Sequence, residues 1–473
     1  VVVLNDNGMS IAPNVGAMSR YFNRVRLNPK LWHTRESVEE RLTDLPGIGP
    51  AFERLGPQLK ESIKAFWAPG LFWEELDWAY VGVIDGHDVR ALRRALRSAF
   101  AAGRPVVVHV ATIKGKGFAP AEDGGLEGME RWHAAKPKSI ANGIAAPAPP
   151  PAKTTPPPQY TAVFGNALVA ECKRDHRVVG ITAAMNSGTG LNILQKQMPE
   201  RYFDVGIAEQ QAILFAAGLA LEGVKPVAAI YSTFLQRAFD QIVHDVCLQK
   251  LNVVFALDRA GLVGDDGPTH HGVFDIAYLR PLPNITLMAP RDEAMLVHML
   301  RTALLHDGPV ALRYPRGAAL GVELPKVPEP IEIGAGEVLR WGDGRVAIVG
   351  YGSGVGRGVD AADLLAEHGI DATVADARFA KPIDGALMTQ LAGEHELLVT
   401  VEEGVLAGGF GTAVWEALNN ADLPDVRILR IGLPDRYVTH GTPAALYEEV
   451  GFTGRRIAER ILSAVAERAV AGT

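Results

Sequence analysis

Short apolar runs that alternate with helical patterns constrain the fold of this chain more than any other feature. Runs rich in Val, Ile and Leu are typical of strands that are buried on both faces of a parallel sheet. The helical segments between them supply the crossovers that parallel strands need. The pattern predicts an α/β protein with three tandem doubly wound α/β domains, the first of them incomplete. The predicted strands and their following turns span residues 1–4, 80–88, 104–112, 178–181, 225–230, 253–257, 345–352, 372–376 and 397–403.

Two proline-dense stretches divide the chain. Residues 144–158 contain seven prolines in a run of small residues, and residues 325–330 contain three more. Proline favours an extended conformation and interrupts helices and central strands, so neither stretch can be a packed element. We therefore expect a linker over 143–158 and domain boundaries that give domains at 1–142, 159–323 and 331–473.

Composition excludes several classes of function. The chain has 473 residues, of which 48% are hydrophobic and 21% charged, and a net charge of −7. This balance offers no basic surface for nucleic acid. Two cysteines are too few for a disulfide framework and do not form a zinc pattern, which favours a reducing cytoplasmic location. No apolar run has the length of a membrane span, and no signal peptide is visible.

The first residues form one of the predicted buried strands. Val1-Val2-Val3-Leu4 is continuous and apolar, and it begins without Met. A central parallel strand needs neighbours and a crossover before it. We therefore expect the chain to open inside a domain, with on the order of 150 further residues before it by ordinary domain size.

One acidic residue opens an otherwise uncharged helix. The helix is predicted from about Ala208 to Leu221 after a short strand or loop, and Glu209 is its lone charged residue. Glu209 could complement the helix dipole or act as a functional acid, and the helix alone favours neither. The face predicted to be buried carries Ile213, Ala216, Ala217, Ala220 and Leu221.

Polar loops follow several of the predicted strands, at the edge where open α/β sheets bind ligands. The turn Asn5-Asp6-Asn7 offers amide and carbonyl oxygens that suit Mg²⁺, although an Asn-rich turn is the commoner explanation. The loop from Asp258 to His271 carries glycines, acids and two histidines, which favours function over a plain turn. Arg313 and Arg316 add two guanidinium groups suited to phosphate or carboxylate.

These motifs together resemble the 1-deoxy-D-xylulose-5-phosphate synthase family of thiamine diphosphate enzymes. The resemblance covers essentially the whole chain in order. It is carried by Leu4–Asn7, Val83–Asp88, Lys114-Gly115-Lys116-Gly117, Asp204–Gln210, Tyr231–Arg237, Asp258–His270, Arg313–Gly317 and Glu402-Glu403.

The resemblance implies condensation of pyruvate with D-glyceraldehyde 3-phosphate to 1-deoxy-D-xylulose 5-phosphate and CO₂, the first step of an isoprenoid precursor pathway that also feeds thiamine and pyridoxol synthesis. It implies thiamine diphosphate and Mg²⁺ as cofactors, and a homodimer. Glu209 would bond to the cofactor's aminopyrimidine, and His133 and His270 would handle protons. The other implied cofactor contacts are Asn7, Met9, Ile11, Lys114 and Phe234, with Asn7 and Met9 on the metal; the implied substrate contacts are Tyr231, Arg237, Arg259, Asp266, His270 and Arg316.

The sequence departs from the family pattern in four ways. A stretch with a Gly-Asp-Gly metal motif is expected before Asn5 and is not in this sequence; Gly8 stands where relatives often have Glu; Gln211 replaces a His. The segment 122–132 is longer than usual, which weakens the assignment of His133.

Three alternatives stay open at this point. Transketolase and the β subunit of a 2-oxoacid dehydrogenase share the second and third blocks, although a β subunit lacks the first. The chain could also be a catalytically incomplete fragment that needs a retained N-terminal piece as its partner. On that reading, residues 1–473 alone bind thiamine diphosphate poorly and make no product.

Overall fold

The computed structural model describes residues 1–9, 71–74, 76–125, 128–129, 132, 157–423 and 426–471. The chain forms two compact units, Val1–Pro150 and Pro151–Thr473, and each is described by itself. The predicted linker lies outside the described residues except for Pro157 and Pro158. Among the helices of the described ranges, none is both long enough and apolar enough to span a membrane.

The described part of the first unit is a parallel sheet with strand order β1-β3-β2. The predicted helix over residues 89–101 is confirmed: Asp88 caps it by accepting hydrogen bonds from the backbone N–H groups of Arg90 and Ala91. The elements are β1 (Val2–Asp6), α5 (Leu71–Glu74), β2 (Ala79–Asp85), α6 (Val89–Ala101), β3 (Val106–Ala111) and α7 (Ala119–Glu122).

The first strand was predicted to be parallel to its neighbour and buried. The parallel pairing is correct, and the burial is wrong. β1 pairs in parallel with β3, but Val1, Val2 and Val3 are 47–49% exposed. The reason is position: within the described residues β1 has a neighbour on one edge alone, whereas β3 lies between two strands and is buried throughout.

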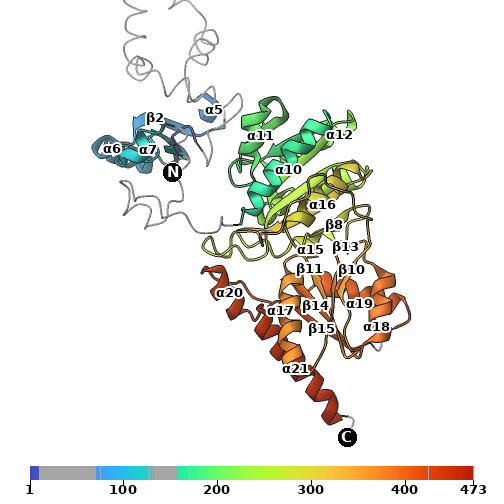
Figure 1. Cartoon of the computed structure of the whole chain (residues 1–473). Coiled ribbons are helices and arrows are strands. Elements are labelled where there is room, and N and C mark those ends of the chain that lie inside the picture. The colour runs from blue at the N-terminus through green and yellow to red at the C-terminus, as the bar shows by residue number, and fades with distance from the viewer. Residues whose placement is uncertain are drawn as a thin grey trace, which may run out of the picture. The chain divides into compact units, whose positions relative to one another are not determined.

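The second unit begins with a seven-stranded sheet in the order β13-β8-β9-β7-β6-β4-β5. The helices α10, α11 and α16 pack on one face through a buried apolar cluster, and Figure 1 shows α10 between α11 and α16. On the other face lie α12, α15 and the broken helical segment that follows β6. The bounds are α10 (Tyr160–Arg174), β4 (Val178–Thr182), α11 (Leu191–Gln197), η1 (Pro199–Arg201), β5 (Tyr202–Asp204), α12 (Glu209–Leu221), β6 (Lys225–Tyr231), α13 (Ser232–Leu235), η2 (Gln236–Ala238), α14 (Phe239–Gln241), η3 (Ile242–Cys247), β7 (Val254–Ala260), α15 (Asp275–Leu279), β8 (Thr286–Met288), α16 (Glu293–Leu305) and β9 (Val310–Pro315).

A five-stranded sheet follows, in the order β10-β12-β11-β14-β15, with β10 antiparallel to its neighbour and the other strands parallel. Helices α17 and α21 cover one face side by side (Figure 1), while α18 and α19 lie on the other. The bounds are β10 (Glu337–Arg340), β11 (Val346–Tyr351), α17 (Gly354–Glu367), β12 (Thr373–Asp376), β13 (Phe379–Lys381), α18 (Gly385–Glu394), β14 (Leu397–Val405), α19 (Phe410–Asn420), β15 (Ile428–Leu433), α20 (Pro443–Glu449) and α21 (Gly454–Ala471).

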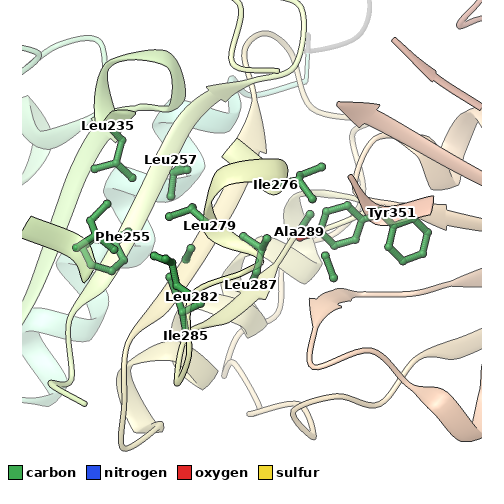
Figure 2. Packing of buried hydrophobic residues seen from close by; sticks show 14 of the residues in the cluster. Leu235, Phe255, Leu257, Ile276, Leu279, Leu282, Ile285, Leu287, Ala289 and Tyr351 are labelled. Atoms are coloured by element: carbon green, nitrogen blue, oxygen red, sulfur yellow. The ribbon is translucent and has the colours of Figure 1, made fainter. Parts of the chain in front are cut away.

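The two sheets of the second unit share one hydrophobic core. Figure 2 shows Leu257 and Leu287 of the seven-stranded sheet in the same cluster as Tyr351 from β11. The third block also contributes a strand to the seven-stranded sheet, because β13 pairs antiparallel with β8. The predicted second and third blocks therefore form one compact body with an α/β architecture in each half.

Candidate functional site

Most sequence-predicted site residues of the second unit gather at one edge of the seven-stranded sheet. β4, β5, β6, β7 and β9 run parallel, so their carboxyl ends meet at the same edge. The segments that leave this edge carry Glu209, then Tyr231 to Arg237, then the loop 261–272, and finally Arg316. The sequence-based placement of these residues at strand ends is confirmed.

Glu209 is the first residue of α12 and is 2% exposed. The entry to the helix is fixed by Asp204, whose carboxylate accepts from the backbone N–H groups of Gly206 (2.9 Å) and Ala184 (2.8 Å). Arg237, whose side chain is 54% exposed, donates to both carboxylate oxygens of Glu209 at 3.2 Å. A carboxylate has about four acceptor sites, so Glu209 can accept further hydrogen bonds from a ligand.

The predicted buried face of α12 is correct for Ile213, Ala216 and Ala217 and wrong for Leu221, which is 62% exposed. Leu221 ends the helix beside a turn at Gly223, beyond the part of α12 that packs on the sheet.

An aromatic cluster follows β6. The rings of Tyr231 and Phe234 stack with centroids 5.7 Å apart, and His270 meets Phe234 edge-on at 5.2 Å. The guanidinium of Arg237 lies 5.5 Å from the Phe234 centroid. Phe234 therefore contacts both Arg237, which pairs with Glu209, and His270.

The ring of Tyr231 is held by Arg259, whose guanidinium lies 3.8 Å from the ring centroid. Arg259 also donates to Asp258 (2.7 Å) and to the carbonyl of Gly188, and its backbone has a left-handed φ of 64°. Such strain in a non-glycine residue is typical of functional sites. Asp258 is fully buried and accepts from Thr161 (2.8 Å); burial raises the pKa of its carboxyl to about 6.

The loop 261–272 is closed at its base by two backbone hydrogen bonds between Gly261 and Gly272 (2.7 and 2.9 Å). Its tip carries Asp266, which forms an ion pair with Arg316 at 2.5 Å. The imidazole of His270 shares a hydrogen bond of 2.9 Å with the Thr269 hydroxyl. Burial lowers the pKa of His270.

In two pairs of similar residues that are close in sequence, the members have different roles in the structure. His270 is partly exposed at the loop tip, whereas His271 is buried and bonds to the backbone N–H of Val263 (3.1 Å). Arg316 reaches the loop tip, whereas Arg313 is buried and paired with Asp275 at 2.9 Å. The expectation that both arginines suit an anionic ligand is therefore wrong for Arg313, whose charge is neutralised inside the core.

The Asn-rich turn of the first unit has the geometry of an Asx turn. The side-chain oxygen of Asn7 accepts from the backbone N–H of Met9 at 3.0 Å, and Gly8 has a φ of 72°. Lys114 follows β3, whose carboxyl end lies beside that of β1. Across the described ranges, no group of three or more His, Cys, Asp or Glu residues is arranged to hold a metal. Two predicted site residues, Ile11 and His133, lie outside the described residues.

Sequence reasoning missed two buried polar networks. In the first unit, His109 bonds to Asp6 (3.1 Å) and to the hydroxyl of Tyr80 (2.6 Å). In the second, the carboxylate of Glu403 accepts from the backbone N–H of Leu262 at the start of the 261–272 loop. The pair Glu402-Glu403 is part of the family resemblance, so the sequence contains a signal for the second network.

Three protein-family models match most of the chain, each over a different part. Residues 1–112 match the family described as 1-deoxy-D-xylulose-5-phosphate synthase. Residues 157–320 match the pyrimidine binding domain of transketolase, and residues 334–457 match the transketolase C-terminal domain.

Curated relatives with the same description cover 98–100% of the chain. A 1-deoxy-D-xylulose-5-phosphate synthase of Synechococcus sp. (strain JA-2-3B'a(2-13)) is 51% identical over 100% of this chain and 72% of its own length. The enzyme from Synechococcus sp. (strain JA-3-3Ab) is 52% identical over 98% of this chain and 71% of its own length. The enzyme from Desulforudis audaxviator is 48% identical over 99% of this chain and 72% of its own length.

Solved structures similar to this chain include transketolases. A split-gene transketolase, described as an inactive β4 tetramer, is 33% identical over 65% of this chain and 98% of its own, with a TM-score of 0.58. The transketolase of Campylobacter jejuni subsp. jejuni NCTC 11168 covers 83% of this chain and 68% of its own at 18% identity, with a TM-score of 0.54. The second likeness shows the fold alone.

Proposed function

The chain belongs to the 1-deoxy-D-xylulose-5-phosphate synthase family, and we propose that Glu209 and the residues around it carry out the thiamine diphosphate-dependent reaction of that family. The reaction condenses pyruvate with D-glyceraldehyde 3-phosphate, releases CO₂ and yields 1-deoxy-D-xylulose 5-phosphate, a precursor of isoprenoids. The fold is that of a transketolase-like enzyme.

The burial of Glu209 is the observation that carries this proposal. A carboxylate at 2% exposure is costly to hold inside a protein unless ion pairs and hydrogen bonds compensate its charge. Within the described residues its hydrogen bonds come from Arg237 alone, so acceptor capacity remains for an aminopyrimidine. Thiamine diphosphate, when bound, supplies the nucleophilic carbon that adds to the carbonyl group of pyruvate. Glu209 then holds a proton at N1′ of the pyrimidine, and Phe234 supports the ring.

The loop 261–272 and its neighbours recognise the aldehyde. The Arg316 guanidinium, presented at the loop tip by its ion pair with Asp266, binds the phosphate of glyceraldehyde 3-phosphate. Asp266 and the hydroxyl of Tyr231 orient the hydroxyl groups of the substrate, and Arg259 fixes the ring of Tyr231. His270, beside Phe234, moves the proton at the aldehyde oxygen.

Arg237 belongs to a different group from Arg316. The family resemblance implied that both arginines contact the aldehyde substrate. Arg237 bonds to Glu209 and lies over Phe234, whereas Arg316 bonds to Asp266. We assign Arg316 to the phosphate, and Arg237 to the junction between the cofactor and substrate residues.

In the first unit, Asn7 and the Met9 carbonyl hold Mg²⁺ and through it the diphosphate, with Lys114 nearby. Amide and carbonyl oxygens are the donors that Mg²⁺ accepts, and the turn at Gly8 brings both residues to the end of β1. Calorimetric titration of thiamine diphosphate into the chain, with Mg²⁺ and then with EDTA, tests this. Equal affinity in Asn7→Ala and the unaltered chain would remove Asn7 from the site. Ile11 and His133 keep their predicted roles, beside the cofactor and in proton transfer.

A product assay tests the proposed function as a whole. The purified chain is incubated with thiamine diphosphate, Mg²⁺, pyruvate and glyceraldehyde 3-phosphate, and both CO₂ and 1-deoxy-D-xylulose 5-phosphate are measured. Transketolase chemistry uses ketose donors and releases no CO₂. Product from a ketose donor in the absence of pyruvate would therefore contradict the proposal.

We expect His270 to act as a neutral base at pH 7 and to lose this role when it is protonated at lower pH. Burial lowers the pKa of His270 below its ordinary value of about 6.5, so the neutral base predominates at pH 7 and protonates below that value. The kcat/KM for the aldehyde should therefore stay level from pH 7.5 to about 6.5 and fall on further acidification. His270→Gln should lower kcat/KM and remove this acidic limb.

His306 provides the matched control. Burial lowers its pKa as well, but it follows α16, away from the loop 261–272. His306→Gln should leave the acidic limb in place. An unchanged limb in His270→Gln would assign it to another group.

We further propose that the enzyme is a homodimer and that α12 lies at the interface. Beyond its polar first turn the helix is apolar on all sides: Ala212 and Ile213 face the sheet, while Leu214 and Leu221 are 44% and 62% exposed. A helix that is hydrophobic all round is normally buried. Light scattering should give twice the chain mass, and Leu221→Glu should shift the population toward the monomer. Val327→Glu changes an exposed apolar residue outside α12 and should leave the dimer intact. An equal effect of both substitutions would place the interface elsewhere.

A further inference from the structure

The carboxylate of Glu403 joins the C-terminal half of the second unit to the loop that carries Asp266 and His270. Glu403 lies in β14 and is 1% exposed. One carboxylate oxygen accepts from the backbone N–H of Leu262 (2.8 Å) and from the hydroxyl of Tyr447 (2.8 Å). The other accepts from the hydroxyl of Ser353. All three donors satisfy a charge that would otherwise be expensive to bury.

The backbone at the base of the loop is shaped around this carboxylate. Gly261 has a φ of 84°, and a Cβ atom there would overlap the carboxylate of Glu403. Gly261 and Gly272 close the loop with two hydrogen bonds. The guanidinium of Arg313 then donates to the carbonyl of Gly272 (3.4 Å) and to the carbonyl of Glu403 itself (3.0 Å). Glu403 is therefore bonded at its side chain to the start of the loop and through Arg313 to its end.

Further contacts from the same half of the unit hold the middle of the loop. His271 bonds to the backbone N–H of Val263 and lies 3.3 Å from the carbonyl of Thr439. The carbonyl of Gly264 accepts from the backbone N–H of Gly441 at 3.4 Å. The segment that remains most exposed is the tip with Asp265 and Asp266. The loop is thus fixed on both sides of the residues assigned to the aldehyde.

We propose that Glu403 is a positioning residue for the aldehyde substrate. By fixing Leu262 it sets the conformation of the loop 261–272 and places Asp266 and His270 against Tyr231, Phe234 and Arg316. This inference rests on the proposed function for its substrate, although the contacts themselves do not. Pyruvate and thiamine diphosphate involve Glu209 on α12, which follows a different strand of the sheet. We therefore expect their binding to depend much less on Glu403 than the binding of the aldehyde does.

The test compares two substitutions in the full chain. Glu403→Ala should raise the KM for glyceraldehyde 3-phosphate by about tenfold or more, the effect of losing a hydrogen bond to a charged group. The KM for pyruvate should change far less. Glu403→Gln should recover most of the affinity, because its amide oxygen can still accept from Leu262 and Tyr447, and the Ser353 hydroxyl can turn to accept from the amide nitrogen.

Glu402 is the matched control. It is the preceding residue of β14, is equally buried, and accepts from the backbone N–H groups of Phe410 (2.6 Å) and Gly411 (2.8 Å) at the start of α19. Glu402→Gln should lower thermal stability without a selective rise in the KM for the aldehyde. A selective rise in this variant would mean that any loss of stability disturbs the site, and would overturn the proposal.

Amide hydrogen exchange gives a readout that does not depend on activity. Glu403→Ala should accelerate exchange in residues 261–272, and Glu402→Gln in residues 410–413. Unchanged exchange in the loop together with an unchanged aldehyde KM would overturn the proposal. If the unaltered chain makes no 1-deoxy-D-xylulose 5-phosphate, the proposed function fails, while exchange still decides whether Glu403 fixes the loop.

A milder variant covers the case in which Glu403→Ala does not fold. Tyr447→Phe removes one hydrogen bond to the carboxylate and keeps the ring that packs against the cluster containing Leu262. It should raise the aldehyde KM by a smaller factor, about two- to threefold, and leave the pyruvate KM unchanged. Equal rises for both substrates would contradict a role specific to the aldehyde.

Discussion

Glu209→Ala and Glu209→Gln are expected to lower kcat by about 10²–10⁴-fold, the usual contribution of a positioned acid or base. Neither variant can hold the proton at the pyrimidine nitrogen, since alanine has no polar group and glutamine cannot ionise. The fold should survive, because the ionic partner of Glu209 is a half-exposed Arg237 rather than a core residue. Steady-state kinetics with saturating substrates, and circular dichroism of each variant, check the two halves of this prediction.

Glu222 offers a control on the same helix. It follows the last residue of α12 and is exposed, so Glu222→Gln removes the same charge from the other end. Its turnover should match the unaltered chain. Activity of Glu209→Gln within tenfold of the unaltered chain, which corresponds to less than about 1.4 kcal/mol of transition-state stabilisation, would refute the role of Glu209.

Arg316→Ala is expected to raise the KM for glyceraldehyde 3-phosphate by roughly 30- to 150-fold. Losing a charge-assisted contact to an anion costs about 2–3 kcal/mol, and Arg316 is partly exposed at the loop tip, where a phosphate can reach it. The KM for pyruvate should stay within a small factor of its original value. Initial rates with each substrate varied in turn measure both constants.

Two further arginine variants sharpen this test. Arg436→Ala removes a guanidinium that also pairs with a carboxylate at 2.7 Å and is similarly exposed, but lies between β15 and α20; both KM values should be unchanged. Arg237→Ala should lower kcat as well as raise the aldehyde KM, because it removes the partner of Glu209. If Arg316→Ala instead raised the KM for pyruvate and spared that for the aldehyde, the assigned roles would be reversed.

The sequence determined the features that depend on local pattern. The bounds of α6, the near-complete span of α12 and most strands followed from apolar periodicity, because this pattern joins residues a few positions apart. Glu209 was predicted as the acid at the start of α12 for the same reason. The positions of Phe234 and His270 after parallel strands followed from the rule that such strands end at a common edge.

The tertiary structure alone decided which of two chemically similar residues faces a ligand. Arg313 and Arg316 stand three residues apart, yet Arg313 pairs with Asp275 inside the core and Arg316 reaches Asp266 at the loop tip. Leu221 likewise is exposed although the pattern of α12 predicted it to be buried. Strand pairing also placed β13 of the third block in the sheet of the second block. Each outcome depends on partners that are distant in sequence, and so does the anchoring of Leu262 by Glu403, 141 positions along the chain. No local pattern encodes such partners, since burial and ion pairing are set by the three-dimensional neighbours of a residue.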